Sequence, residues 1–219
     1  MAVNNWRDYS VLLFDLDGTL VDSAADIHRS LNLALHDLGL PVVTGQQVRT
    51  WVGRGAGRLV HCVIEHLHLA AHWHEPLLKQ FMQRYQAEVC VDSELYDGVL
   101  AFLDAAKAQG CQLACITNKP YQPARDLLAA LDLLPYFSLL LGGDSLDHRK
   151  PHPAPILHAL QYYRVDAPQA LMIGDSRNDV EAAHAAGVAC VVLTYGYNHG
   201  EPITLCQPDL ILDSLRELL

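Results

Sequence analysis

The spacing of hydrophobic positions changes along this 219-residue chain. Residues 11–14 form an uninterrupted apolar run that ends in acidic residues and a glycine, a pattern typical of a buried strand. Between residues 21 and 93 apolar positions recur at helical spacing, with no convincing strand. After residue 96 short apolar runs alternate with helical segments as far as the last residue. This order predicts an α/β fold that contains an all-helical stretch.

The alternating part of the chain predicts a doubly wound sheet. Strands that alternate with helices pair mostly in parallel and are covered on both faces, as in a Rossmann-like fold. Because the first strand belongs to the same sheet, we expect the helical stretch to be an inserted cap. We therefore predict an α/β core of residues 1–21 and 94–219 and a helical cap of residues 22–93. Strands are expected at 112–116, 137–141, 170–173 and 188–193, helices at 99–109, 123–131, 153–163 and 178–186, and a last strand and helix within 210–219.

Composition and charge narrow the classes of function. Hydrophobic residues make up 51% of the chain, which is enough for a sizeable core and argues against disorder. The formal net charge of -10 and the lack of a basic run argue against a nucleic-acid partner. No apolar run is long enough for a membrane span, and the first residues do not resemble a signal peptide. The six cysteines form no C-x-x-C pair, so we expect a reduced, cytoplasmic protein.

Chemically competent side chains cluster at the predicted strand ends. In open α/β sheets ligands bind at the carboxyl ends of the strands, where loops from distant segments meet. Taken singly, each segment is also typical of a turn, a helix cap or a solvated lysine, but their common placement favours one pocket. The side chains concerned are Asp15 and Asp17 after the first strand, Thr117 and Asn118 after the strand at 112–116, Lys150 in a loop, and Asp175 and Asp179 after the strand at 170–173.

These residue types together suit phosphoryl transfer. A carboxylate such as Asp15 can attack phosphorus, and a second acid such as Asp17 can protonate the leaving oxygen and then activate water. A hydroxyl and backbone amides at 117–118 could hold phosphoryl oxygens, while Lys150 and a metal neutralise the charge of the transition state. Crowded acids repel, and a divalent cation would offset that repulsion. Asp175 adds a hard oxygen ligand, which suits Mg²⁺ better than zinc.

Six short stretches, spread over essentially the whole chain, carry a resemblance to a known family. They are DLDGTLVDS at 15–23, WVGRGA at 51–56, TNKP at 117–120, GGD at 142–144, KPHP at 150–153 and YGYN at 195–198. The chain resembles the haloacid dehalogenase-like (HAD) superfamily of hydrolases, and within it the bacterial phosphoglycolate phosphatases.

The resemblance implies a role for each predicted site residue. Asp15 would be the nucleophile that forms an aspartyl-phosphate, and Asp17 the general acid/base that also offers its backbone carbonyl to Mg²⁺. Thr117 and the Asn118 amide would bind the phosphoryl group, and Lys150 would pair with Asp15 and with the phosphate. The implied catalytic residues are Asp15, Asp17, Thr117 and Lys150, and the implied metal site is Asp15, Asp17, Asp175 and Asp179, with Asp179 acting through water or orienting Lys150.

One departure from the family pattern lies in the predicted cap. The family often has Asn where this chain has Arg54. Arg54 and Arg58 could bind a substrate carboxylate, and they are equally typical of solvent-exposed helix arginines. Because the family uses the cap for substrate choice, the departure leaves the identity of the substrate open.

The resemblance implies a Mg²⁺-dependent phosphomonoesterase, which we expect to convert 2-phosphoglycolate to glycolate and phosphate. Its partner would be a small phosphorylated metabolite, and the chain would be a monomer or a homodimer. Alternatives of the same fold are a phosphatase for a sugar phosphate or pyrophosphate and a phosphoglucomutase. Phosphonate hydrolysis would need a Schiff-base lysine in the cap, where Lys79 is the only lysine and is expected to face solvent. A non-catalytic binding protein is the remaining alternative, and the intact set of acids with Lys150 argues against it.

Overall fold

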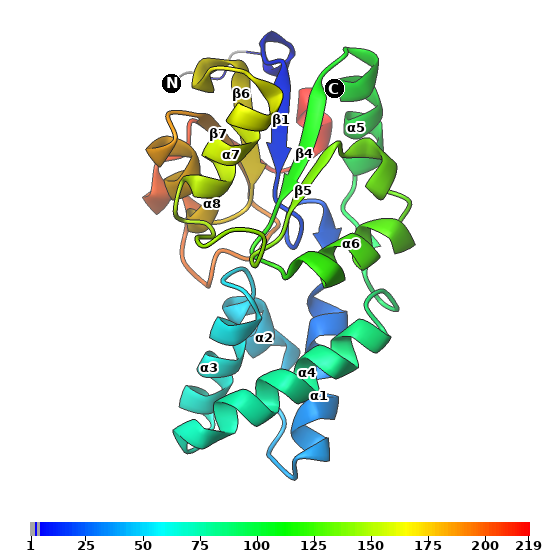
Figure 1. The fold of residues 1–219 in the computed structure, drawn as a ribbon, viewed down its shortest axis with the longest axis vertical. Coiled ribbons are helices and arrows are strands. Elements are labelled where there is room, and N and C mark those ends of the chain that lie inside the picture. Colours follow the sequence, from blue (N-terminus) through cyan, green and yellow to red (C-terminus); the bar gives the residue numbers. More distant parts are fainter. Residues whose placement is uncertain (1–2, 4) are drawn as a thin grey trace.

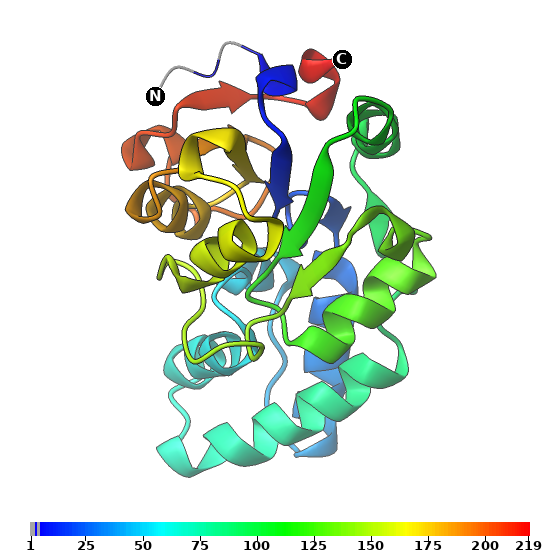
Figure 2. The same ribbon diagram turned by 45° about the horizontal axis from the view of Figure 1, so that its top comes forward.

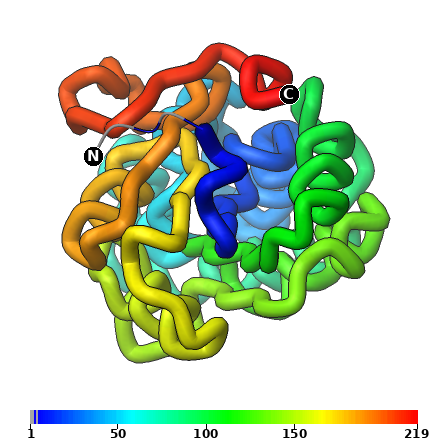
Figure 3. The backbone as a smooth tube through the Cα atoms, turned by 90° about the horizontal axis from the view of Figure 1, so that it is seen from above, coloured from blue at the N-terminus to red at the C-terminus, as the bar shows by residue number. Residues whose placement is uncertain are grey.

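A single parallel sheet organises the larger part of the molecule. The computed structural model describes residue 3 and residues 5–219. Six strands follow one another in the order β5-β4-β1-β6-β7-β8. β1 therefore lies inside the sheet, and Figure 3 shows it in dark blue between the yellow and green segments. The strands are β1 (Val11–Phe14), β4 (Gln112–Ile116), β5 (Leu139–Leu141), β6 (Ala170–Gly174), β7 (Ala189–Leu193) and β8 (Leu210–Leu212).

The central strands are buried on both faces because alternate side chains enter different cores. Leu12 and Phe14 of β1 belong to one hydrophobic cluster, whereas Val11 and Leu13 belong to another. Helices contribute to each cluster, so the sheet is doubly wound, as predicted (Figures 1 and 2). The first cluster includes residues of α5 (Val99–Ala108) and α6 (Tyr121–Ala130), and the second includes residues of α7 (Ala154–Tyr163) and α8 (Arg177–Ala185).

A helical insertion, residues 24–87, lies beyond the carboxyl ends of the core strands (Figure 1). Two short antiparallel strands, β2 (Val21–Asp22) and β3 (Glu94–Leu95), flank it. The sequence pattern predicted no strand at residues 21–22, because a two-residue strand is too short to show a periodicity. The expected α/β fold with an inserted helical region is confirmed. The insertion contains α1 (Ala24–Asp37), α2 (Gly45–Trp51), α3 (Ala56–His66) and α4 (His74–Ala87).

The insertion has a hydrophobic core of its own, and hydrogen bonds connect it to the segment that returns to the sheet. Leu31 of α1 and Leu77 of α4 are fully buried in that core. Asp26 of α1 accepts hydrogen bonds from the backbone N–H groups of residues 91–93 and from the hydroxyl of Ser93. The segment that leaves the insertion is therefore fixed against the helix that enters it.

Element boundaries differ from the prediction mainly where tight turns intervene. The predicted strand at 137–141 begins at residue 139, because a 3₁₀ turn ends only at residue 136. The predicted last helix is a short 3₁₀ helix. Among the described residues, every helix is too short or too polar to traverse a lipid bilayer. The 3₁₀ segments are Trp6–Asp8, Ala71–Trp73, Leu134–Tyr136, Ala167–Gln169, Ile203–Cys206 and Leu215–Leu218.

Candidate active site

The carboxyl ends of β1, β4 and β6 bring the predicted site residues together. Asp15 follows β1, Thr117 follows β4 and Asp175 follows β6. β1 pairs in parallel with both other strands, so these three residues leave the sheet at the same edge. Lys150 comes from the loop before α7, and Asp179 lies in the first turn of α8.

Lys150 is buried and joins two of the acids. Its Nζ lies 3.0 Å from Oδ1 of Asp15 and 2.7 Å from Oδ1 of Asp179. The same nitrogen donates to the backbone carbonyl of Ile116 at 2.5 Å. All three donors of the ammonium group therefore have acceptors, which is what a buried lysine requires.

Asp175 is held by neighbours from two other loops. Its Oδ1 accepts the hydroxyl of Thr19 at 3.0 Å, and its Oδ2 accepts the backbone N–H of Tyr197 at 2.5 Å. A Cβ atom at Gly196 would lie 2.2 Å from this side chain. Only glycine therefore lets the YGYN segment, which carries part of the family resemblance, approach so closely.

Three carboxylates are close enough to share one cation. One oxygen from each of Asp15, Asp175 and Asp179 lies within 4.8 Å of the others. Burial raises the pKa of Asp15 to about 7 although Lys150 opposes the shift, and burial with the nearby Asp179 raises the pKa of Asp175. One lysine against three acids leaves the cluster short of positive charge. The all-oxygen donor set and this imbalance fit a divalent cation such as Mg²⁺.

Asp17 points to a different partner, which the sequence argument did not assign. The Nζ of Lys119 lies 2.9 and 3.0 Å from its two carboxylate oxygens, and the hydroxyl of Ser23 also donates to it. Both Asp17 and Lys119 are buried. Lys119 lies beyond the end of β4, in a loop where no periodicity reports the direction of a side chain, so the sequence pattern carried no signal for this pair.

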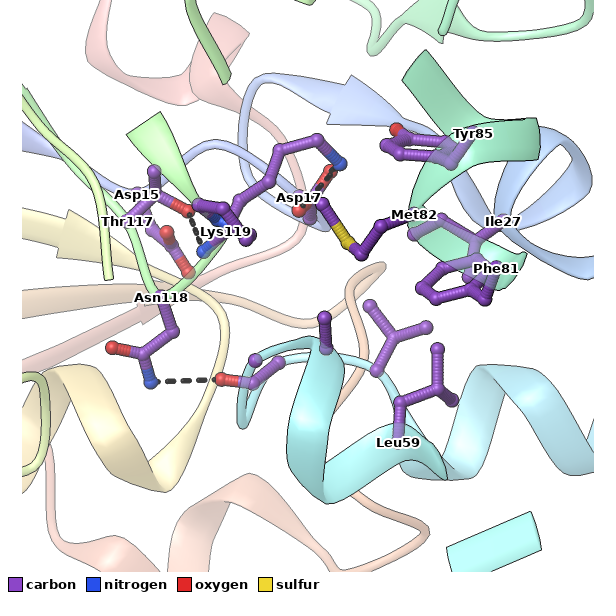
Figure 4. A pocket seen from close by; sticks show the side chains of 15 residues that line it. Asp15, Asp17, Ile27, Leu59, Phe81, Met82, Tyr85, Thr117, Asn118 and Lys119 are labelled. Carbon is purple, nitrogen blue, oxygen red and sulfur yellow. Dashed lines mark hydrogen bonds and ion pairs between the residues drawn. The ribbon is translucent and has the colours of Figure 1, made fainter. Parts of the chain in front are cut away.

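Thr117 and Asn118 lie in the same loop, with different surroundings. The hydroxyl of Thr117 accepts the backbone N–H of Lys119 at 3.2 Å. The Asn118 side chain donates to the backbone carbonyls of Gly53 and Lys150, each at 2.9 Å. It therefore joins the helical insertion to the core, while a role of its backbone amide in phosphate binding stays a prediction (Figure 4).

A cavity of about 50 Å³ separates the core loops from the helical insertion. The core contributes its acids and the 117–120 loop, and the insertion contributes mainly apolar side chains (Figure 4). Its walls are formed by Asp15, Asp17, Ile27, Val52, Gly53, Gly55, Ala56, Leu59, Phe81, Met82, Tyr85, Thr117, Asn118, Lys119 and Pro120.

The two arginines predicted to bind substrate lie apart from this cavity. Arg54 lines a separate cavity of about 240 Å³ together with His199 and Glu201. Arg58 lies 3.9 Å from the carboxylate of Glu65, and 41% of its side chain is exposed. Neither contributes to the wall that contains the predicted nucleophile. The sequence could not show this, because adjacent residues of one loop face different cavities.

Comparison with known proteins identifies the family. The model of haloacid dehalogenase-like hydrolases matches residues 12–193. The chain belongs to this family. It is 39% identical over 236 residues to the phosphoglycolate phosphatase of Escherichia coli K12, covering 99% of this chain and 94% of that protein. It is 43% identical over 213 residues to phosphoglycolate phosphatase 1 of Pseudomonas aeruginosa PAO1, covering 95% and 78%.

A solved structure supports the same relationship for this HAD hydrolase. The crystal structure described as a predicted phosphoglycolate phosphatase from Haemophilus somnus 129pt is 40% identical, with a TM-score of 0.92 over 96% of both chains. The expectations of a HAD fold and of a phosphoglycolate phosphatase-like hydrolase are confirmed.

Proposed function

We propose that this HAD phosphatase hydrolyses 2-phosphoglycolate to glycolate and phosphate with the help of Mg²⁺. The observation that carries the proposal is the buried cluster of Asp15, Lys150, Asp175 and Asp179, in which Asp15 also lines a small cavity. Full-length relatives named phosphoglycolate phosphatase support the choice of substrate. The insertion of residues 24–87 would serve as the cap over the pocket, as the sequence predicts.

The chemistry follows from two carboxylates with separate surroundings. Asp15 attacks phosphorus, the bond from phosphorus to the ester oxygen breaks, and Asp17 gives its proton to the departing glycolate oxygen. Asp17 then takes a proton from water, which attacks phosphorus and breaks its bond to Asp15. General acid–base help of this kind contributes roughly 10²–10⁴-fold. The two carboxylates face different cations, since Asp15 faces Lys150 and Asp17 faces Lys119.

The metal site would be formed by Asp15 and Asp175, with the Asp17 backbone carbonyl and Asp179 in the predicted supporting roles. Bound Mg²⁺ would supply positive charge to the phosphoryl oxygens. One oxygen of Asp179 accepts from Lys150, and the other accepts the hydroxyl of Ser176 at 2.8 Å. The contact with Lys150 supports the predicted role of Asp179 in orienting that lysine.

The walls of the cavity favour a short substrate with few hydroxyl groups. The insertion lines it mainly with Ile27, Val52, Leu59, Phe81 and Met82, which offer no hydrogen-bond donor to a substrate, and Tyr85 supplies the one hydroxyl of this wall among the described residues. A sugar phosphate would bury hydroxyls against this wall, and each unsatisfied polar group costs about 1–3 kcal/mol. The single methylene of 2-phosphoglycolate carries no such cost, which leaves only its carboxylate in need of a polar partner.

The test is phosphate release from 2-phosphoglycolate, with and without Mg²⁺, beside a panel of sugar phosphates and pyrophosphate. We expect the highest kcat/KM for 2-phosphoglycolate and complete dependence on the metal. Asp15→Asn should abolish turnover while the circular dichroism spectrum stays unchanged. Wild-type turnover in this variant would contradict the role of Asp15.

Two further assays separate the alternatives. A higher kcat/KM for a sugar phosphate than for 2-phosphoglycolate would overturn the proposed substrate. Transfer of phosphate from a sugar bisphosphate to a second sugar, rather than to water, would indicate a mutase. If the wild-type protein released phosphate from none of the compounds tested, the result would favour a binding protein instead.

A further inference from the structure

Lys119 is the only cationic side chain among the described residues that line the cavity. Its ammonium group lies between the Asp17 carboxylate and the ring of Tyr85, whose centroid is 4.5 Å from Nζ (Figure 4). An ammonium has three N–H donors, and the two oxygens of Asp17 occupy at most two of them. The position of Lys119 suits a second acceptor, because its charge faces a cavity rather than solvent.

Tyr85 adds a second polar donor at the same point. It comes from α4 of the helical insertion and is only 3% exposed. Its O–H has no acceptor among the residues that the structure describes. A buried hydroxyl donor without an acceptor is costly, and tyrosine hydroxyls usually find a partner when buried. Lys119 and Tyr85 therefore bring one charge and one free donor together from opposite walls of the cavity.

We propose that Lys119 and Tyr85 bind the carboxylate of the substrate, so that the enzyme selects small phosphomonoesters that carry a carboxylate beside the ester carbon. This inference rests on the proposed function. In 2-phosphoglycolate the carboxyl carbon is two bonds from the ester oxygen, which is the atom that Asp17 would protonate. Lys119 contacts Asp17 directly, so its ammonium lies where the carboxylate of a substrate aligned on Asp17 must come. The apolar walls would leave such a carboxylate without any other charged partner.

The rival interpretation is that Lys119 only positions Asp17. The two roles separate when a charged and an uncharged substrate of the same shape are compared. We would measure kcat and KM with Mg²⁺ for 2-phosphoglycolate and for its amide, 2-phosphoglycolamide. The variants are Lys119→Met, Lys119→Arg and Tyr85→Phe, with Lys79→Met as the matched control because Lys79 is exposed on the same helix as Tyr85. Circular dichroism melting curves check that each variant is folded.

The kcat/KM of wild type should be about tenfold or more higher for 2-phosphoglycolate than for the amide, the range expected for hydrogen bonds to a charged group. This ratio is the preference that the variants test. Lys119→Met should remove most of that preference, whatever it does to turnover of the amide. Lys119→Arg should restore part of it, and Tyr85→Phe should lower it about threefold. Lys79→Met should match wild type on both substrates.

Two results would overturn the inference. Wild type could show no preference for the charged substrate, or Lys119→Met could keep the preference by slowing both substrates by the same factor. In each case the proposed function still stands if wild type releases phosphate from 2-phosphoglycolate. If wild type hydrolyses neither compound, the proposed function fails and this inference fails with it.

Discussion

Replacing Lys150 with methionine should destabilise the protein strongly, because the lysine balances two buried carboxylates. Its Nζ lies 3.0 Å from Asp15 and 2.7 Å from Asp179, and 1% of its side chain is exposed. At an effective dielectric constant near 20, each pair is worth about 6 kcal/mol of attraction. The variant no longer bears the desolvation cost of a buried ammonium, so its net loss of stability is smaller than this attraction. Removing one partner of a buried ion pair typically costs about 3–5 kcal/mol.

The assay is thermal unfolding of Lys150→Met at pH 7.5 in the presence of EDTA, followed by circular dichroism. For a chain of this size, 1 kcal/mol corresponds to roughly 2–4 °C in Tm, so we expect a decrease of about 6–20 °C. Lys79→Met removes an exposed lysine and should change Tm by no more than about 2 °C.

The loss of stability in Lys150→Met relative to wild type should become smaller as the pH falls. Burial raises the pKa of Asp15 to about 7 with the lysine present, and loss of Lys150 would raise it further. Folded Lys150→Met would then bind protons that the unfolded chain, with an aspartate pKa near 3.9, does not bind. Its stability relative to wild type must therefore increase from pH 7.5 to pH 5.5. A Tm change below about 2 °C at pH 7.5, or a deficit that grows toward pH 5.5, would refute the charge-balance argument.

Three further substitutions test other parts of the structure. Gly196→Ala should lower kcat/KM at least tenfold with little loss of folding, because its Cβ would lie 2.2 Å from Asp175 and displace that carboxylate. Gly57→Ala in α3 is the matched control, because an added Cβ there meets nothing within 4 Å. It should keep full activity and gain about 0.5–1 kcal/mol of stability in urea unfolding. Equal activities of the two variants would contradict the Gly196 argument. Burial alone would raise the pKa of Asp26, but hydrogen bonds from Ser93 and the neighbouring amides outweigh it and lower the pKa. The stability that Asp26 contributes is thus present above about pH 4 and lost as the pH falls through its lowered pKa, so Asp26→Asn should cost about 1–3 kcal/mol at pH 7 and progressively less below pH 4. A cost that stays constant between pH 7 and pH 3 would count against this assignment.

The alternation of apolar runs and helical segments was enough to predict the doubly wound sheet and the helical insertion. The same local pattern placed Asp15, Thr117 and Asp175 at strand ends, because a strand end is visible where an apolar run meets polar residues. Parallel pairing then brings these ends to one edge of the sheet whatever the loops do. The short strand β2 was missed because two residues carry no periodicity.

Tertiary structure alone decided how side chains pair across the cavity. Lys119 meets Asp17 and Tyr85 only because the insertion folds back over the loop after β4, and nothing in the spacing of these residues encodes that contact. The sequence was equally consistent with Arg54 binding the substrate and with Arg54 facing solvent, and the structure places it in another cavity. The direction of a loop side chain depends on where the loop docks, which periodicity does not report. Backbone pattern therefore determined which elements carry the chemistry, and packing between the insertion and the core determined which charges face one another.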